Sequence, residues 1–246
     1  MKQISQGAEA IISLANSSEL PLDVRVGGKT QSNSGDGGGD LFVIKKRISK
    51  NYRIPELDKK IIKQRTKSET KILTKASKII PVPKPEEQKT ENEIIMPFIE
   101  GDKLSLSLDN YPLKKQEQVM LQIGKTIGKM HKENLIHSDL TTSNMIYVKN
   151  AKNNYVGVGG RGATRAKKDG GIVYIIDFGL GFQNGKYEDK GVDIHLLKQA
   201  LEAKHFKHWE ILFKQFKKGY ESINKQEAEK VFNKLNSIEK RGRYRH

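Results

Sequence analysis

Residues 137–144 read His-Ser-Asp-Leu-Thr-Thr-Ser-Asn, and residues 175–179 read Ile-Ile-Asp-Phe-Gly at the end of an apolar, strand-like run. Together they supply the side chains that phosphoryl transfer needs. The carboxylate of Asp139 can take a proton from an attacking hydroxyl or water, and the side chains of Asn144 and Asp177 can ligate Mg²⁺. The two stretches therefore predict a site for Mg-ATP chemistry.

The order of the two motifs and the D-x-x-x-x-N spacing match the catalytic loop and the D-F-G motif of protein kinases. Either motif alone is a weak signal, whereas both in this order, each beside a strand-like run, rarely arise by chance. The segment from Asp177 to Asp193 is too short for the long activation segment and A-P-E element with which ordinary protein kinases hold a peptide substrate. The sequence therefore predicts a kinase-like site without that segment.

The composition is typical of a soluble, basic globular protein. Of 246 residues 35% are hydrophobic, and 45 Lys and Arg against 29 Asp and Glu give a net charge of +16. The chain has no cysteine, which excludes disulfides and thiolate metal sites. No apolar run approaches the roughly 18 residues of a membrane span, and the N-terminus lacks a signal-peptide pattern, so we expect a cytoplasmic protein without membrane contact.

Positive charge is concentrated in two segments. Between Lys45 and Lys78, thirteen Lys or Arg residues accompany three acids. Residues 240–246 read Lys-Arg-Gly-Arg-Tyr-Arg-His, a basic tail with an aromatic ring that suits phosphate contact and base stacking, and we expect its end to be free. A charge run is more often a solvated helix face. The pattern leaves both interpretations open, with RNA as the first polyanion to consider.

The N-terminal part predicts strands that could hold a nucleotide. Residues 1–16 are typical of a β-hairpin, and residues 27–40 of a flexible, Gly-rich loop. In the strand predicted at 41–45, alternation places Val43 and Lys45 on one face. A valine there can cover an adenine and a lysine can reach its phosphates, although a lone strand lysine is usually a surface residue.

A basic helix is predicted to follow, from Pro55 to about residue 79. Glu69 is the only acid between residues 59 and 78, and it could form an intrahelical salt bridge or hold the strand lysine against the phosphates. Residues 94–101 predict a strand that runs into a glycine turn, which we interpret as the boundary between two lobes.

One glycine motif has the wrong context for phosphate binding. Residues 157–162 satisfy G-x-G-x-x-G, but they follow the catalytic loop, do not pass from a strand into a helix, and have polar, Lys-rich neighbours. We interpret residues 149–171 as a hairpin insertion between strands at 145–148 and 172–176. By loop-closure entropy such an insertion costs only about 1.4 kcal/mol.

The second half also predicts a helical core. The helix expected at 113–133 carries one apolar stripe with two glycines that permit close packing, and Asp193 is expected to begin a second helix. The predicted core residues recur at helical spacing. They are Val119, Ile123, Ile127, Met130, Ile194, Leu196, Leu197, Ala200, Leu201, Phe206, Trp209, Leu212, Phe213, Phe216, Tyr220, Val231, Phe232, Leu235 and Ile238.

Several strings together have the pattern of one family. They are Gln-Gly-Ala-Glu-Ala at 6–10, the basic helix entry at 52–66, His-Ser-Asp-Leu-Thr-Thr-Ser-Asn-Met at 137–145, Ile-Asp-Phe-Gly-Leu-Gly at 176–181, Glu-Asp-Lys at 188–190, Asp-Ile-His-Leu-Leu-Lys at 193–198, and Arg-Gly-Arg at 241–243. In these strings the chain closely resembles the kinase/ATPase subunit of the archaeal and eukaryotic KEOPS complex, the bud-site-selection and p53-related kinase family.

The resemblance implies an α+β, two-lobed, protein-kinase-like fold, compact and without a long activation segment. Its small β-rich N-lobe would span residues 1–98, including the basic helix 55–79, its mainly helical C-lobe residues 99–238, and a basic tail residues 239–246. It further implies an atypical Ser/Thr kinase and ATPase that uses ATP and Mg²⁺. In that family the protein binds the threonylcarbamoyl-transferring subunit and other KEOPS subunits, and it assists tRNA modification beside the anticodon.

The same resemblance implies roles for individual residues. Lys45, oriented by Glu69, would bind the phosphates, Asp139 would be the catalytic base, and Asn144 and Asp177 the Mg²⁺ ligands. The nucleotide would contact Gly7, Ala8, Glu9, Val43, Lys45, Met96, Pro97, Ile99 and Ile146. Residues 96–99 would form the hinge. The turn at 7–9 has a single glycine, so its position in the chain, and not its sequence, assigns it as the turn that covers the phosphates.

Three positions depart from the usual pattern. Pro97 stands in the hinge where a residue with its own N–H is more common, but the hinge contact needs its carbonyl. Ser138 replaces the usual glycine of the loop, which crowds the turn. Thr141 stands where conventional Ser/Thr kinases have a lysine near the γ-phosphate, and one positive charge fewer there predicts slow transfer.

Three other functions fit parts of the sequence. A small-molecule kinase of the aminoglycoside or choline type shares the catalytic logic but needs a larger, often acidic substrate pocket. A RIO-type kinase is nearer, although Thr-Thr-Ser at 141–143 argues against it. An RNA-binding scaffold with a vestigial nucleotide pocket does not explain why Lys45, Asp139, Asn144 and Asp177 are all present.

Overall fold

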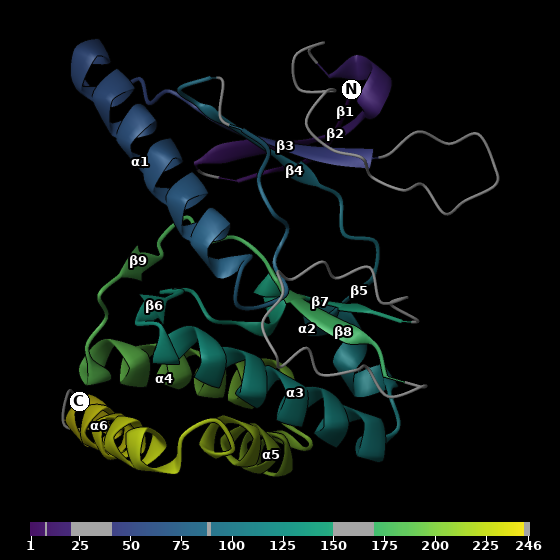
Figure 1. Cartoon of the computed structure of the whole chain (residues 1–246), viewed down its shortest axis with the longest axis vertical. Coiled ribbons are helices and arrows are strands. Elements are labelled where there is room, and N and C mark those ends of the chain that lie inside the picture. Colours follow the sequence, from purple (N-terminus) through teal and green to yellow (C-terminus); the bar gives the residue numbers. More distant parts are fainter. Residues whose placement is uncertain (8, 21–40, 88–89, 150–169, 244–246) are drawn as a thin grey trace. The chain divides into compact units, whose positions relative to one another are not determined.

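The computed structural model describes residues 1–7, 9–20, 41–87, 90–149 and 170–243 (Figure 1). The glycine-rich loop predicted at 27–40, most of the insertion predicted at 149–171, and Ala8 lie outside the described residues. The chain divides into two compact units. Unit 1 comprises Met1–Thr74 and Pro83–Ile99, and unit 2 comprises Lys75–Val82 and Glu100–His246, so residues 75–82 belong to unit 2 although the predicted N-lobe range includes them.

Unit 1 is a four-stranded antiparallel sheet with one long helix. The strands are β1 (Lys2–Gln6), β2 (Ala10–Asn16), β3 (Leu41–Arg47) and β4 (Glu93–Pro97), in the order β1-β2-β3-β4, and the 3₁₀ turn η1 (Ser17–Glu19) follows β2. The helix is α1 (Pro55–Ala76). The hairpin predicted at 1–16 is confirmed, and the basic helix begins at Pro55 as predicted and ends three residues earlier than expected.

Strand β3 has two different faces because side chains alternate along a strand. Ile44 is buried with Ala15 and Leu20 in an apolar cluster against which Phe42 and Ile95 pack. Val43, Lys45 and Arg47 occupy the opposite face, and the two cations are buried there. The apolar face therefore anchors the strand in the core and fixes the direction of the cationic face.

Unit 2 is mainly helical with two small sheets. Its strands are β5 (Asp102–Lys103), β7 (Met145–Val148) and β8 (Ile172–Ile175), in the order β5-β7-β8, and the pair β6 (Leu135–Ile136) and β9 (Phe182–Gln183). Its helices are α2 (Leu104–Ser107), η2 (Leu108–Asn110), α3 (Leu113–Lys132), η3 (Thr142–Asn144), α4 (Tyr187–Lys204), α5 (Trp209–Glu221) and α6 (Lys225–Arg243). None of the helices in the described ranges is long and apolar enough to cross a membrane.

Helix α3 packs on α5, and α4 packs on α6 (Figure 1). The predicted stripe of Val119, Ile123, Ile127 and Met130 is buried as expected. The two predicted glycines of α3 allow close approach: a Cβ added at Gly124 would lie 2.0 Å from the carbonyl oxygen of Phe216 on α5. The α3–α5 contact is therefore backbone against backbone.

Two predictions about the helices are wrong. Asp193 does not begin a helix, because α4 starts at Tyr187 and Asp193 is fully buried inside it. Phe206 is not in the core: it is 77% exposed, since the chain breaks between α4 and α5 and the helical spacing on which the prediction rested does not continue across that break.

The C-terminal tail also differs from its prediction. Helix α6 continues to Arg243, so residues 239–243 belong to the last helix and not to a separate tail. The guanidinium of Arg241 pairs with Glu188 at the start of α4. This part of the basic cluster is therefore tied to unit 2, and residues 244–246 lie outside the described ranges.

The α3–α5 contact predicts a large effect of a single methyl group. Gly124→Ala should lower the free energy of unfolding by about 1–3 kcal/mol or more, because the added Cβ meets backbone that cannot rotate away. Gly7→Ala is the matched control, since its Cβ would have its nearest neighbour 3.9 Å away. Denaturant unfolding of both variants measures the difference. Equal free energies of unfolding for the two variants would contradict the close backbone contact of α3 with α5.

Candidate functional site

In unit 1 the two cations of strand β3 share one carboxylate from α1. The ammonium of Lys45 donates to Oε1 of Glu69 at 2.7 Å, and Nη2 of Arg47 donates to Oε2 at 2.6 Å. All three side chains are buried, and Glu69 is only 1% exposed. Glu69 therefore pairs the helix with the strand and does not form the intrahelical salt bridge that the sequence left open. This arrangement fixes the position of the Lys45 ammonium.

Glu9, from the turn between β1 and β2, extends this cluster. Its carboxylate accepts from Nη1 of Arg47 at 3.4 Å and pairs with Arg65 of α1. The hydrogen bond from Arg65 holds the pKa of Glu9 below its ordinary value, and the charge of Arg47 acts in the same direction. The turn predicted to cover phosphates is therefore held to β3 and α1 by charge.

The contacts of this cluster join cations and carboxylates from β3, α1 and the β1–β2 turn. Lys45, Arg47 and Arg65 face the carboxylates of Glu9 and Glu69. The sequence prediction missed Arg47, although the alternation that places Val43 and Lys45 on one face extends by two residues to Arg47.

The other predicted nucleotide contacts of unit 1 lie on neighbouring strands. Val43 of β3 pairs with Met96 of β4 in the sheet register, and Pro97 pairs with Phe42. The N–H of Phe98 donates to the carbonyl of Leu41 at 2.9 Å, which fixes the chain just before Ile99. The N–H of Gly7 closes the β1–β2 turn on the carbonyl of Ala10. The structure thus brings Val43 beside Met96; a contact of these residues with nucleotide stays a prediction.

In unit 2 the catalytic loop is ordered by hydrogen bonds around His137. Its Nδ1 accepts from the N–H of Asp139 at 3.2 Å, so the proton of the neutral ring is on Nε2, which donates to the carbonyl of Ile176 at 3.0 Å. The ring also lies against Phe178, with 4.6 Å between the ring centroids. His137 therefore links the loop that carries Asp139 to the segment that carries Asp177.

The carboxylate of Asp139 is oriented by Asn144. The amide nitrogen of Asn144 donates at 2.9 Å both to Oδ2 and to the backbone carbonyl of Asp139. Since the nitrogen faces Asp139, the amide oxygen of Asn144 points elsewhere and can act as a metal ligand. Asp177 has a left-handed φ of 62°, and its Oδ1 accepts from the N–H of Gly179 at 3.1 Å. Oxygen ligands of this kind are those that Mg²⁺ prefers, so the residues present fit the ion.

Asp193 holds the catalytic loop through its backbone. Its two oxygens accept from the N–H groups of His137 and Ser138, both at 2.7 Å. Ser138 has a φ of 65°, a region that favours glycine and costs a serine of order 1 kcal/mol or more. The expected crowding at Ser138 is therefore real backbone strain, and the charge-assisted bonds to Asp193 offset it.

A second layer of residues positions Asp193 itself. The Nε2 of His131 contacts Oδ2 of Asp193 at 3.3 Å, and Nδ1 of the same ring contacts the hydroxyl of Tyr220 at 3.0 Å. Burial lowers the pKa of His131 and raises that of Tyr220, so both are neutral: Tyr220 donates to Nδ1, and Nε2–H donates to the carboxylate. The sequence did not predict that His131 or Tyr220 supports the site.

His205, just after α4, supports the other end of the loop. Its Nε2 contacts the hydroxyl of Thr142 at 3.1 Å, and its Nδ1 contacts Asp109 at 2.9 Å. Ile146, predicted to contact the nucleotide, lies on β7 between Lys103 and Tyr174 and is half-buried. Helix α4 therefore holds the catalytic loop through Asp193, and the residue after it holds η3.

Comparison with known proteins identifies the family. The RIO domain family matches residues 43–156. The KEOPS complex subunit Bud32 of Pyrococcus abyssi is 39% identical over 248 residues, which cover 100% of this chain and 97% of that protein. The EKC/KEOPS complex subunit BUD32 of Enterocytozoon bieneusi is 34% identical over 219 residues, covering 83% of this chain and 91% of that protein.

The chain belongs to the Bud32 family of KEOPS complex subunits. It is also similar to a larger protein: a probable bifunctional tRNA threonylcarbamoyladenosine biosynthesis protein of Methanocorpusculum labreanum is 35% identical over 206 residues, which cover 83% of this chain but 33% of that protein. The chain thus spans about a third of such a bifunctional relative. The RIO domain family matches less than half of this chain, whereas the Bud32 relatives cover 83% to 100% of it, so the preference for a KEOPS subunit over a RIO-type kinase is confirmed.

A solved structure confirms the predicted fold class. The chain described as WaaP in complex with acyl carrier protein aligns with a TM-score of 0.53 and 11% identity, covering 97% of this chain and 88% of that chain. Identity this low carries information about the fold alone. With the RIO match, it confirms the α+β, protein-kinase-like fold.

The buried imidazole of His131 predicts a pH dependence of stability. Its pKa in the folded protein lies below the ordinary 6.5, so the unfolded chain binds one more proton at mildly acidic pH. This contribution to stability is present above pH 6.5 and is lost as pH falls toward the folded pKa, with a slope of up to about 1.4 kcal/mol per pH unit. His131→Gln should remove that slope. Denaturant unfolding between about pH 7.5 and 5 measures it, and an identical slope in both proteins would contradict the assignment.

Proposed function

We propose that this protein is an atypical Ser/Thr protein kinase and ATPase that uses Mg-ATP and acts as a KEOPS subunit in tRNA threonylcarbamoyladenosine biosynthesis. The observation that carries the proposal is the arrangement around Asp139. Its Oδ2 is held by Asn144, and the residues just before it in the loop are clamped by Asp193. A carboxylate fixed in this way is positioned to act as a general base.

The proposed role of Asp139 is to remove a proton. With Oδ2 bonded to Asn144, the described residues place no hydrogen bond on Oδ1 of Asp139, which leaves this oxygen to accept the proton of an attacking hydroxyl or water. The amide oxygen of Asn144 and the carboxylate of Asp177 would hold Mg²⁺, which neutralises charge on the phosphates when it is bound. Thr141 in place of a lysine leaves transfer without one cation, so we expect a slow enzyme.

Unit 1 would bind the nucleotide. Lys45, oriented by Glu69, would contact the phosphates, and the neighbouring cations Arg47 and Arg65 would favour an anion there. Val43 and Met96 on adjacent strands offer apolar surface for the adenine. The turn at residues 7–9 and the hinge at residues 96–99 complete the set that the family resemblance implies.

The partners follow from the names of the relatives and from charge. Bud32 relatives are KEOPS subunits, and others are named for tRNA threonylcarbamoyladenosine biosynthesis, so we propose KEOPS subunits and tRNA as partners. On α1, exposed Lys59, Lys63, Lys67 and Lys71 recur every four residues. Lys63 pairs with Glu91, and the described residues offer the other three no carboxylate within 4.0 Å. Like charges at this spacing repel, so such a stripe favours a polyanion as partner.

Two variants separate chemistry from binding. Asp139→Asn should lower ATP turnover by roughly 10²- to 10⁴-fold while nucleotide still binds, because only the base is removed. Asp177→Ala should instead abolish Mg²⁺-dependent nucleotide binding. Glu229→Gln, an exposed carboxylate on α6, is the control. Turnover should be measured with and without tRNA and the threonylcarbamoyl-transferring subunit, and undiminished turnover in Asp139→Asn would sink the proposed chemistry.

RNA binding can be tested through its salt dependence. Replacing Lys59, Lys63, Lys67 and Lys71 by Gln should lower the slope of log affinity for tRNA against log salt by roughly 0.7 to 0.9 for each phosphate that the variant no longer neutralises. A matched set of four exposed lysines in and beside α4 and α5 is the control: Lys204, Lys207, Lys214 and Lys218. A truncation of residues 240–246 tests the tail separately. If only the control set or the truncation changes the slope, α1 does not bind RNA.

A further inference from the structure

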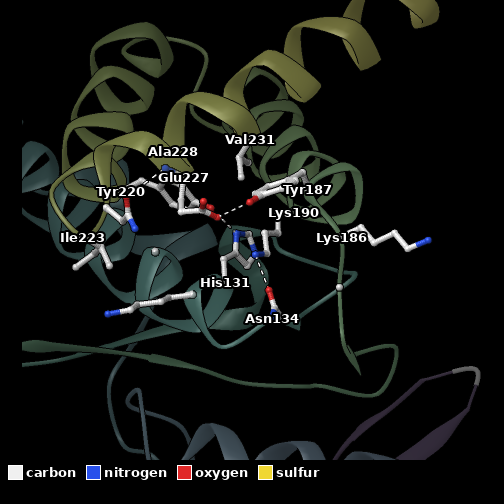
Figure 2. Close-up of a pocket in the computed structure, with 14 residues that line it drawn as sticks. His131, Asn134, Lys186, Tyr187, Lys190, Tyr220, Ile223, Glu227, Ala228 and Val231 are labelled. Atoms are coloured by element: carbon white, nitrogen blue, oxygen red, sulfur yellow. Dashed lines mark hydrogen bonds between the residues drawn. The ribbon is translucent and has the colours of Figure 1, made fainter.

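Unit 2 contains a cavity that the proposed chemistry does not use. Its volume is about 560 Å³, and its walls come from α3, the start of α4 and α6 (Figure 2). Asp139, Asn144 and Asp177 do not line it. Cavities of roughly 300 to 1,000 Å³ are typical of small-molecule sites. The residues that line the cavity indicate which class of ligand it would bind.

The most informative group in the cavity is the ammonium of Lys190. The residue is only 6% exposed, and its nitrogen donates to Oδ1 of Asn134 at 2.7 Å (Figure 2). Within the described parts of the chain, no carboxylate lies within 4.0 Å of it. Burial lowers its pKa, and the charge of Glu227, which acts in the opposite direction, only partly compensates. A buried charge is normally paired, whereas the hydrogen bond of this ammonium goes to a neutral amide.

The one acid of the lining is already engaged. Glu227 accepts from the hydroxyl of Tyr187 at 2.8 Å and from Lys230 at 2.9 Å. Its own pKa is lowered first by the bond from Lys230, and the charge of Lys190 is a weaker influence in the same direction. Two further lysines of the lining, Lys132 and Lys186, are exposed. The cavity therefore has an excess of positive charge around one buried ammonium.

The remaining wall is apolar. Ile223, Ala228 and Val231 line it together with the ring of Tyr220 (Figure 2). An inorganic ion would fill only a fraction of the volume and leave this wall in contact with water. An anion that carries an organic group would cover the wall and pair with Lys190 at the same time.

We propose that this cavity binds a small organic oxyanion, a phosphate monoester or a carboxylate with an apolar body, and that Lys190 recognises the oxyanion. The apolar body lies against Ile223, Ala228 and Val231. Binding at this place does not depend on the proposed Mg-ATP function.

The cavity shares a wall with the support of the catalytic loop. His131 lines it, and the same ring bonds Asp193, whose carboxylate holds the N–H groups of His137 and Ser138. A ligand in the cavity therefore lies one side chain away from the residue that fixes the loop of Asp139. Occupancy should be visible at the amides of His137 and Ser138, and any effect on turnover rests on the proposed function.

Phenyl phosphate, benzoate, inorganic phosphate and benzyl alcohol form the probe set, titrated into the full chain saturated with Mg-ADP. Methyl NMR signals of Ile223, Ala228 and Val231 report on the cavity, and amide signals of His137 and Ser138 report on the loop. We expect saturable shifts at the cavity methyls with phenyl phosphate or benzoate, at least tenfold tighter than with inorganic phosphate or benzyl alcohol. The stronger of the two aromatic anions identifies the head group. Absence of saturable shifts at these methyls for both would overturn the proposal.

Variants localise the binding. Lys190→Met keeps the length of the side chain and removes its charge, and it should weaken binding at least tenfold, whereas Lys125→Gln, an exposed lysine on α3, should not. Ala228→Leu fills the cavity without touching the charge and should also block binding, which keeps the test valid if Lys190→Met fails to fold. Unchanged affinity in either folded variant would overturn the site, and unshifted His137 and Ser138 amides at saturation would overturn its link to the loop.

Discussion

The carboxylate of Asp193 is the group on which the loop of residues 137–144 in unit 2 depends. It is completely buried, and it accepts hydrogen bonds from two consecutive backbone N–H groups of the catalytic loop and from His131. Each bond to a charged group is worth about 1.5 to 3 kcal/mol, which is enough to hold Ser138 in its left-handed conformation. Because Asp139 follows directly, the position of the proposed base is set by a residue of α4.

Unit 1 buries two cations together with one carboxylate. Glu69 is nearly as buried as Asp193, but its partners are two cations from β3. Burying Lys45 and Arg47 without this carboxylate would cost several kcal/mol for each ion. With it, the cations stay on one face of the strand at a cost that the apolar cluster around Ile44 on the other face helps to offset.

The sequence predicted what depends on local periodicity. The hairpin, the long basic helix and the buried stripe of α3 follow from alternation and from 3.6-residue spacing, and the order of Asp139, Asn144 and Asp177 follows from the motif. Contacts between residues that are far apart in the sequence could not be predicted from these patterns. Asp193 was assigned to a helix start, yet its carboxylate accepts hydrogen bonds from the backbone N–H groups of residues 137 and 138. Arg47 was missed because the predicted strand ended at residue 45, whereas β3 continues to Arg47. Phe206 was misplaced because helical spacing does not reveal the short break between α4 and α5.

Three buried charged groups, Asp193, Glu69 and Lys190, differ in how completely their charge is balanced. Asp193 has three donors, which satisfy a carboxylate in neutral surroundings. Glu69 accepts from two cations. Lys190 has one amide oxygen for three N–H groups and an aromatic ring with its centroid 5.3 Å away. Since the cost of a buried charge falls only as its partners are supplied, the surroundings of Lys190 mark a place where an anion from outside would stabilise the fold, and the balanced carboxylate of Asp193 marks a place whose role is support.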